Sequence, residues 1–174
     1  MITRDLSEKL SRAAEKWPAV TLTGPRQSGK TTLCRELFPQ LAYVNLESPD
    51  TRAFAIEDSR GFLAQFSGGA ILDEFQRAPD LLSYLQEIID EDPLPGRWIL
   101  TGSQNLALLK SASQSLAGRT AAFNLLPLAR SEVQHFPKYP KTLDETLLMG
   151  SYPRVFDADL EPVDWYRSYV SNYV

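Results

Sequence analysis

The eight residues Gly24-Pro25-Arg26-Gln27-Ser28-Gly29-Lys30-Thr31 have the types and spacing needed to hold a chain of phosphates. They match G-x-x-x-x-G-K-[ST], the phosphate-binding loop of nucleotide triphosphatases. The two glycines permit a tight turn and a close approach of backbone to ligand. Several backbone N–H groups can then point at one anion. The segment predicts a nucleotide-binding loop.

The side chains of this loop have separate expected roles. Lys30 should reach the β- and γ-phosphates, Thr31 should offer its hydroxyl to Mg²⁺, and Thr32 should lie near the α-phosphate. The helix expected over 30–38 adds the positive end of its dipole. The expected nucleotide contacts are Gly24, Pro25, Arg26, Gln27, Ser28, Gly29, Lys30, Thr31 and Thr32. The alternative is an ordinary glycine-rich turn with an exposed lysine.

Two adjacent carboxylates, Asp73 and Glu74, follow a short apolar segment. We expect Asp73 to hold Mg²⁺ beside Thr31. Glu74 is placed to orient and polarise an attacking water. Two neighbouring carboxylates are costly to desolvate together unless they share a cation. The alternative is the acidic start of an ordinary loop.

Three further polar residues are candidates for the same chemistry. Ser103 is the first choice, and Gln104 the second, for a side chain that senses the γ-phosphate; a simple turn is the alternative. Arg119 is a candidate donor of positive charge to the transition state, in its own chain or in a neighbouring subunit. A solvated or ion-paired arginine is the alternative there. Arg26 is expected to pair with Glu47 or to touch the nucleotide.

The elements that must position these residues alternate between strand and helix. Strands are expected over 19–22, 42–46, 70–74, 97–101 and 120–126. Helices are expected over 4–17, 30–38, two short stretches within 50–66, from 79 to about 90, up to 116, and over 129–136, 142–149 and 162–173. Asp5 is the expected cap of the first helix, and Pro79 the first residue of the helix that it begins.

Alternating strands and helices predict a parallel sheet that is covered on both faces. A ligand then belongs at the carboxyl ends of the strands. We expect every candidate at such an end, with Arg119 across the sheet from the others.

Composition bounds the class of protein. The 174 residues suit one domain with a core of its own. The net charge of −4 argues against a broad basic surface for nucleic acid. Cys34 is the only cysteine, so no disulfide can form within the chain. No apolar run approaches a membrane span, and residues 1–17 lack the apolar core of a signal peptide. We expect a cytoplasmic protein with no membrane partner.

Several motifs occur in a fixed order along the chain, at 24–33, 45–47, 71–79, 100–104, 116–119, 125–128 and 150–155. Together they resemble the prokaryotic AAA-type (AAA+) ATPases that carry a C-terminal domain of unknown function. The resemblance implies an α/β P-loop NTPase fold. It has three αβα layers and a five-stranded parallel sheet of order 5-1-4-3-2, followed by a short helical region. It also implies ATP and Mg²⁺ as ligands, the stated roles of Asp73 and Glu74, and a functional Arg119.

The resemblance divides the chain in two. Residues 1–128 are expected to form the ATPase core, and residues 129–174 the start of a truncated helical lid or linker. The leading function is hydrolysis of ATP to ADP and phosphate, coupled to the helical region. The alternative is a nucleotide-gated binding or signalling module with negligible turnover, and a third is phosphate transfer to a small molecule. Two partners besides ATP and ADP stay open: a second copy of the chain, and a nucleic acid or protein bound through a C-terminal region.

Overall fold

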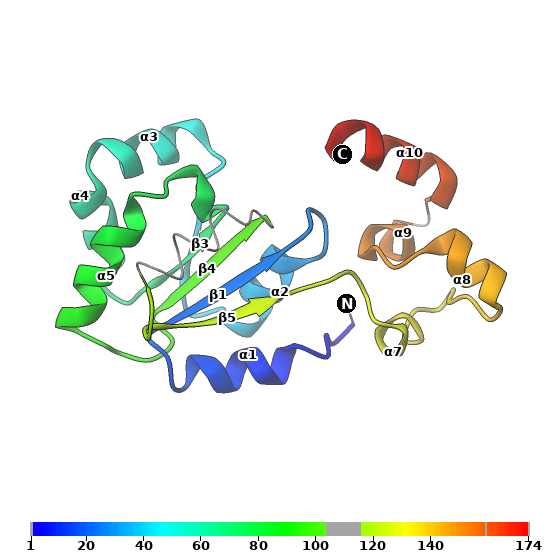
Figure 1. Cartoon of the computed structure of the whole chain (residues 1–174), viewed down its shortest axis with the longest axis horizontal. Coiled ribbons are helices and arrows are strands. Elements are labelled where there is room, and N and C mark those ends of the chain that lie inside the picture. The colour runs from blue at the N-terminus through cyan, green and yellow to red at the C-terminus, as the bar shows by residue number, and fades with distance from the viewer. Residues whose placement is uncertain (1, 104–115, 159, 174) are drawn as a thin grey trace.

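Five parallel strands form one sheet at the centre of the fold (Figure 1). The computed structural model describes residues 2–103, 116–158 and 160–173. Its strands are β1 (Ala19–Gly24), β2 (Ala42–Asn45), β3 (Ala70–Asp73), β4 (Trp98–Ser103) and β5 (Thr120–Asn124). The order across the sheet is β2-β3-β4-β1-β5, which is 5-1-4-3-2 when read from the other edge. Each neighbouring pair is parallel, so the carboxyl ends of all these strands share one edge.

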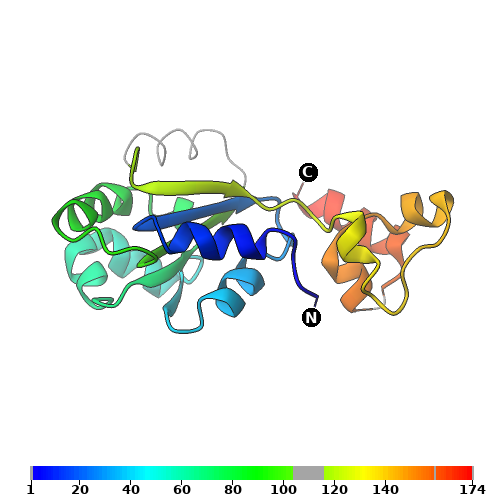
Figure 2. The same ribbon diagram turned by 90° about the horizontal axis from the view of Figure 1, so that it is seen from below.

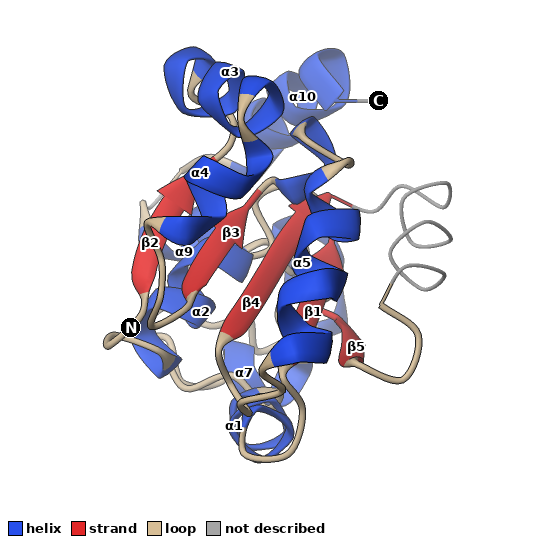
Figure 3. Cartoon of the chain, turned by 90° about the vertical axis from the view of Figure 1, so that its left-hand side faces the viewer, coloured by secondary structure: helices blue, strands red, loops and turns tan. Residues whose placement is uncertain are grey.

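Helices cover both faces of this sheet, as the alternation of elements predicts (Figure 3). One face carries α1 (Ser7–Ala14) and α2 (Lys30–Leu37). The other face carries α3 (Pro49–Glu57), α4 (Ser59–Ala64) and α5 (Leu81–Glu91). A single 3₁₀ turn, η1 (Phe75–Arg77), follows β3.

Alternation of side chains along the strands creates two separate cores. Ile71 and Ile99 are buried with α1 and α2, whereas their neighbours Leu72 and Leu100 are buried with α3, α4 and α5. Successive side chains of a strand point to opposite faces. A strand that is covered on both sides therefore needs a continuous apolar run, which the sequence contains.

A group of short helices follows β5 and stands beside the carboxyl edge of the sheet (Figure 2). Its members are α7 (Arg130–Val133), α8 (Leu143–Met149), α9 (Pro153–Asp157) and α10 (Pro162–Tyr173). Leu128, Val133 and Phe136 form a small core there, and Ile2 and Phe156 pack against it. The first described residue thus packs on the C-terminal helices and not on the sheet.

Some expected boundaries are wrong. The first helix begins at Ser7 with Leu6 as its N-cap, and the carboxylate of Asp5 instead accepts a hydrogen bond from Ser131 Oγ at 2.7 Å. The helix expected from Pro79 begins at Leu81, because Pro79 and the next residue form a turn. Sequence reasoning missed α9, a five-residue helix that begins with a proline. The helix expected up to 116 falls largely outside the described residues.

Among the described residues, no helix has the length and apolar character that crossing a bilayer requires.

Candidate functional site

The loop from Gly24 to Thr31 joins the end of β1 to the start of α2 and depends on two glycines. Gly29 has a φ of +96°, and Gly24 one of +154°. A Cβ atom at Gly24 would lie 2.2 Å from the backbone oxygen of Leu125. At both positions a side chain would be strained, so the loop needs glycine there.

Lys30 is turned back onto its own loop. Its Nζ donates to the backbone oxygens of Gly24 at 3.0 Å and of Pro25 at 2.8 Å. Burial lowers the pKa of this ammonium group, and the nearby carboxylates of Glu74 and Asp73 partly offset that effect. Phosphate oxygens could replace these carbonyl oxygens as acceptors, and their negative charge would then balance the charge of the ammonium group.

Ser28 adds an unsatisfied group to the same loop. Its Oγ is buried and has no hydrogen-bond partner among the described residues. Buried polar atoms are normally paired, and an orphan one indicates an absent ligand or water. The loop is therefore a concave site with polar groups that an anion would satisfy.

Asp73 lies directly beneath the start of α2. Its Oδ2 accepts hydrogen bonds from Thr31 Oγ1 and from the Tyr43 hydroxyl, both at 2.8 Å. Its Oδ1 accepts from Thr101 Oγ1. Only 4% of Asp73 is exposed. Three hydroxyl donors compensate for the burial of this carboxylate and hold it against the loop.

The donors at this point suit a magnesium ion. The Thr31 hydroxyl and the Asp73 carboxylate are hard oxygen ligands of the type that Mg²⁺ prefers. No group of three or more His, Cys, Asp or Glu side chains within the described ranges could hold a metal. The oxygen set fits an ion that shares its coordination between protein and substrate phosphates.

Glu74 has a left-handed backbone conformation, with φ at 57° and ψ at 43°. It lines a cleft of about 520 Å³ together with Lys30 and Thr31. Its carboxylate accepts a hydrogen bond from Gln76 Nε2, which also donates to Ser103 Oγ at 3.0 Å. The structure thus brings Glu74 and Ser103 together beside the loop. Gln104 lies outside the described residues.

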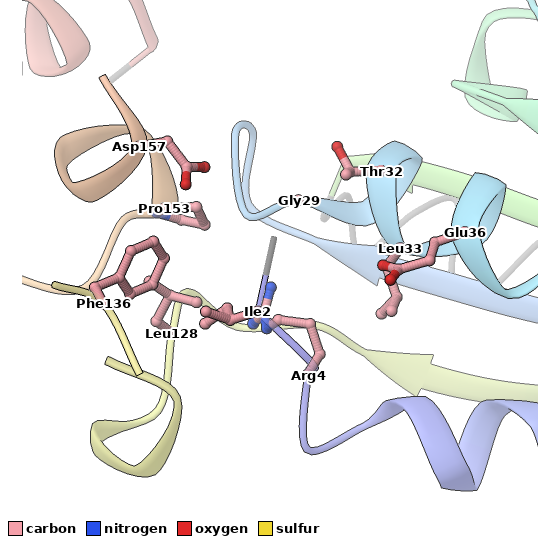
Figure 4. Close-up of a pocket in the computed structure, with 10 residues that line it drawn as sticks. All are labelled: Ile2, Arg4, Gly29, Thr32, Leu33, Glu36, Leu128, Phe136, Pro153 and Asp157. Atoms are coloured by element: carbon pink, nitrogen blue, oxygen red, sulfur yellow. The ribbon is translucent and has the colours of Figure 1, made fainter. Parts of the chain in front are cut away.

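A smaller, mostly apolar cavity of about 70 Å³ lies next to the cleft. Figure 4 shows Phe136, Leu128 and Pro153 on one side of it, and Gly29 and Thr32 on the other. Gly29, Thr32, Pro153 and Asp157 line both spaces. The C-terminal helices therefore supply one wall of the site.

Arg4 joins the loop to those helices, which sequence reasoning missed. Its guanidinium donates to the backbone oxygen of Ser28 at 2.8 Å and to that of Leu126 at 2.9 Å. Its Nε also pairs with Glu132 Oε1 at 3.0 Å, and both side chains are buried. The other oxygen of Glu132 accepts from the backbone N–H of Ala129 at 2.7 Å.

The expected place of Arg119 is wrong. Its backbone oxygen accepts from the N–H of Ala19, the first residue of β1, so it lies at the amino ends of the strands. The strand between this point and the loop is roughly 17 Å long at 3.3 Å per residue. The guanidinium is held by Asp90, with Nη2 and Oδ2 2.7 Å apart. A residue directly before a parallel strand lies at its amino end, and this excludes a role for Arg119 at the site of its own chain.

Arg26 and Glu47 do not pair with each other. The Arg26 guanidinium lies over the ring of Tyr173, 5.0 Å from its centre, and its backbone oxygen accepts from the Tyr169 hydroxyl at 3.2 Å. Glu47 lies 3.5 Å from an Arg77 nitrogen. Both Arg26 and Glu47 nevertheless line the cleft.

Other site residues missed from sequence are Tyr43, Gln76 and Thr101. Thr101 carried a signal, since it is a polar residue directly after the apolar run 98–100; in β4 it is the register partner of Asp73. Glu132 carried one too, because an acidic residue at the third position of a helix often caps it. Tyr43 and Gln76 have no local pattern that distinguishes them.

Comparisons with known proteins identify the family of the chain. A family model described as an AAA domain matches residues 16–134. Two uncharacterized proteins, from Mycobacterium tuberculosis and Mycobacterium bovis, are each 34% identical over 176 residues. That similarity covers 98% of this chain, but the chain spans only 38% of the length of those relatives.

Solved structures show the same fold at low sequence identity. A Walker-type ATPase of Pyrococcus abyssi superposes with a TM-score of 0.58 at 18% identity, over 99% of this chain and 68% of that one. The ORC2 protein of Aeropyrum pernix, solved as ADPNP–ADP complexes, gives 0.52 at 17% identity, over 76% of this chain and 50% of that one.

Proposed function

We propose that this chain, which belongs to the AAA domain family of P-loop proteins, binds ATP with Mg²⁺ and hydrolyses it to ADP and phosphate. One observation carries the proposal: Asp73 contacts Thr31 at 2.8 Å, and Glu74 lines the same cleft as the loop. The loop alone would support binding. A carboxylate pair beside it supports hydrolysis as well.

Each residue of the site would have a separate role in binding or hydrolysis. The backbone N–H groups from Ser28 to Thr31 and the Lys30 ammonium would bind the phosphates. Thr31 and Asp73 would hold Mg²⁺, which neutralises charge that develops on the phosphates. Glu74 would take a proton from the attacking water. Ser103 would contact the terminal phosphate, because it is the register partner of Gly24 at the start of the loop.

The apolar cavity next to the loop suits the nucleotide base. A flat heterocycle would pack between Thr32 on one side and Phe136 and Pro153 on the other (Figure 4). Pockets for such ligands are mostly apolar with a few polar groups at the rim. Binding there would bring the ligand into contact with both the core and the C-terminal helices.

That contact supports a coupling role for residues 129–174. Arg154 and Asp157 of α9 and Tyr173 of α10 line the phosphate cleft. Loss of the terminal phosphate would change what these side chains face and so favour another arrangement of the helices. We assign residues 1–128 to the ATPase core and residues 129–174 to a helical region that responds to it.

Two substitutions test this function by phosphate release and nucleotide affinity. Lys30→Ala should abolish binding of ATP, since it removes the charge that faces the phosphates. Glu74→Gln should keep binding and lower turnover by about 10²–10⁴-fold, the usual effect of a lost general base. Lys16→Ala and Glu57→Gln change exposed residues of the same types and should leave both unchanged. Parental turnover in Glu74→Gln would remove that residue from the mechanism.

The second candidate is a nucleotide-gated module with negligible turnover. It is favoured by one observation, that Lys30 and Glu74 are both occupied by contacts within the chain. Tight retention of ATP with almost no phosphate release would support it. Since the relatives are much longer, a second copy of the chain and a nucleic acid or protein partner are proposals for the whole protein.

A further inference from the structure

Among the described residues, Gln76 is the side chain that hydrogen-bonds to both Glu74 and Ser103. Its Nε2 donates to Glu74 Oε2, and it donates to Ser103 Oγ at 3.0 Å. Neither Glu74 nor Ser103 is fully buried. One amide group therefore hydrogen-bonds to the residue that follows β3 and to the last residue of β4, and both belong to the proposed reaction.

The chemistry of the partners sets the orientation of this amide. A carboxylate can only accept hydrogen bonds, so the nitrogen of Gln76 must face Glu74. The second hydrogen of the same nitrogen then goes to the oxygen of Ser103. The hydroxyl hydrogen of Ser103 stays available to an acceptor such as a phosphate oxygen.

The absence of a side chain at Gly102 leaves space for the Gln76 amide. A Cβ atom at Gly102 would lie 2.4 Å from Gln76 Oε1 and 3.0 Å from the Phe75 ring, so glycine leaves room for both. The Oε1 atom is itself buried and has no partner among the described residues. An orphan acceptor is unfavourable, and it is tolerated here where the nitrogen makes a bond to a charged group.

We propose that Gln76 is a positioning residue that couples contact with the terminal phosphate at Ser103 to the orientation of Glu74. This inference rests on the proposed function. While the amide holds both partners, the carboxylate that polarises the water keeps a fixed direction relative to the hydroxyl that touches the phosphate. A shift of Ser103 on binding or release of phosphate is then transmitted to Glu74 through one side chain.

Loss of the Gln76 donor should lower the rate of ATP turnover and leave ATP binding almost unchanged. Gln76→Met keeps the length and removes the donor, and Gln76→Glu keeps the shape but puts a second carboxylate beside Glu74 in place of the donor. Both variants should lower kcat by roughly 10-fold or more, as expected for a lost hydrogen bond to a charged group. For Gln76→Met, ATP affinity should stay within about twofold, because Gln76 is not part of the loop and the change adds no charge. Gln40→Met changes an exposed glutamine and serves as the control.

A double-mutant cycle distinguishes positioning from packing. If Gln76 acts through Glu74, Gln76→Met should have little further effect on kcat in a Glu74→Gln background. A purely structural role would lower kcat by the same factor in both backgrounds, and it would lower affinity too. Equal factors in the two backgrounds would overturn the inference.

The possible results distinguish failure of the positioning role of Gln76 from failure of the proposed ATP hydrolysis. A chain that releases phosphate, needs Glu74 and tolerates Gln76→Met with parental kcat would refute the inference alone. A chain that binds no nucleotide would refute both. A chain that binds nucleotide and releases no phosphate would overturn the inference as well, since Glu74 would then polarise no water.

Discussion

At the scale of single residues, Asp73 is held by more donors than the phosphate-loop motif requires. Thr31 and Tyr43 donate to the same carboxylate oxygen. A threonine that turns toward Mg²⁺ leaves this oxygen, and Tyr43 then remains as its fixed donor. Burial and the hydrogen bond to Asp73 raise the pKa of Tyr43, so the phenol stays protonated and able to donate at neutral pH.

Tyr43→Phe should therefore weaken the dependence of ATP binding on magnesium. Removing one donor to a charged acceptor costs about 1.5–3 kcal/mol at most. We expect the Mg²⁺ concentration for half-maximal ATP binding to rise by roughly 3- to 10-fold, with little change in binding when EDTA is present. Titration calorimetry at several Mg²⁺ concentrations measures this, and Tyr139→Phe at an exposed position is the control. An unchanged Mg²⁺ requirement would show that Thr101 alone orients Asp73.

At the scale of elements, the Arg4–Glu132 pair connects the segment before α1, the phosphate loop and α7. The two residues are 128 positions apart, and their side chains are 9% and 4% exposed. Removing one member of a buried pair leaves an uncompensated charge and typically costs 3–5 kcal/mol. Replacing both by apolar residues avoids that cost.

Arg4→Met and Glu132→Leu should each lower the free energy of unfolding by about 3 kcal/mol, and the double variant by much less than the sum. Urea denaturation measures these changes. Arg4→Met and the double variant should also weaken ATP binding, because both leave the Ser28 backbone oxygen without its donor. Arg12→Met breaks an exposed pair with Glu8 and should change stability far less. Additive effects of Arg4→Met and Glu132→Leu would contradict a shared network.

At the scale of the whole molecule, the C-terminal helices reach the phosphate loop from two sides. Arg4, which pairs with α7, donates to Ser28, and Tyr169 of α10 donates to the Arg26 backbone oxygen. The opposite end of the sheet holds Arg119 and Asp90, far from the loop. Any action of Arg119 on nucleotide therefore needs a second copy of the chain.

If Arg119 acts on the nucleotide of a second copy of the chain, the rate of phosphate release should depend on protein concentration. Phosphate release per chain should rise as copies associate, and Arg119→Ala should remove that rise. At the lowest concentrations the two proteins should release phosphate at the same rate within about twofold, since the residue makes only a surface pair within its own chain. Light scattering with ATP or ADP present reports the mass beside each rate. A rate per chain that does not depend on concentration would exclude Arg119 from catalysis.

The sequence by itself determined the phosphate loop, the alternation of strands and helices and, through family resemblance, the order of the sheet. These follow from local properties: the glycine spacing around Lys30, the apolar runs such as 70–72, and the carboxylates that follow them. Patterns of this kind involve residues that are close in sequence, so they can be recognised without knowing the tertiary structure.

Only the tertiary structure decided which distant residues complete the site. Tyr43, Gln76, Arg4 and Glu132 reach it through packing between segments up to 128 positions apart, and such contacts leave no periodic trace in the chain. Arg119 is the converse case, because the direction of β5 carries it to the far end of the sheet. Side-chain chemistry names the candidates, but strand direction and long-range packing determine which of them meet.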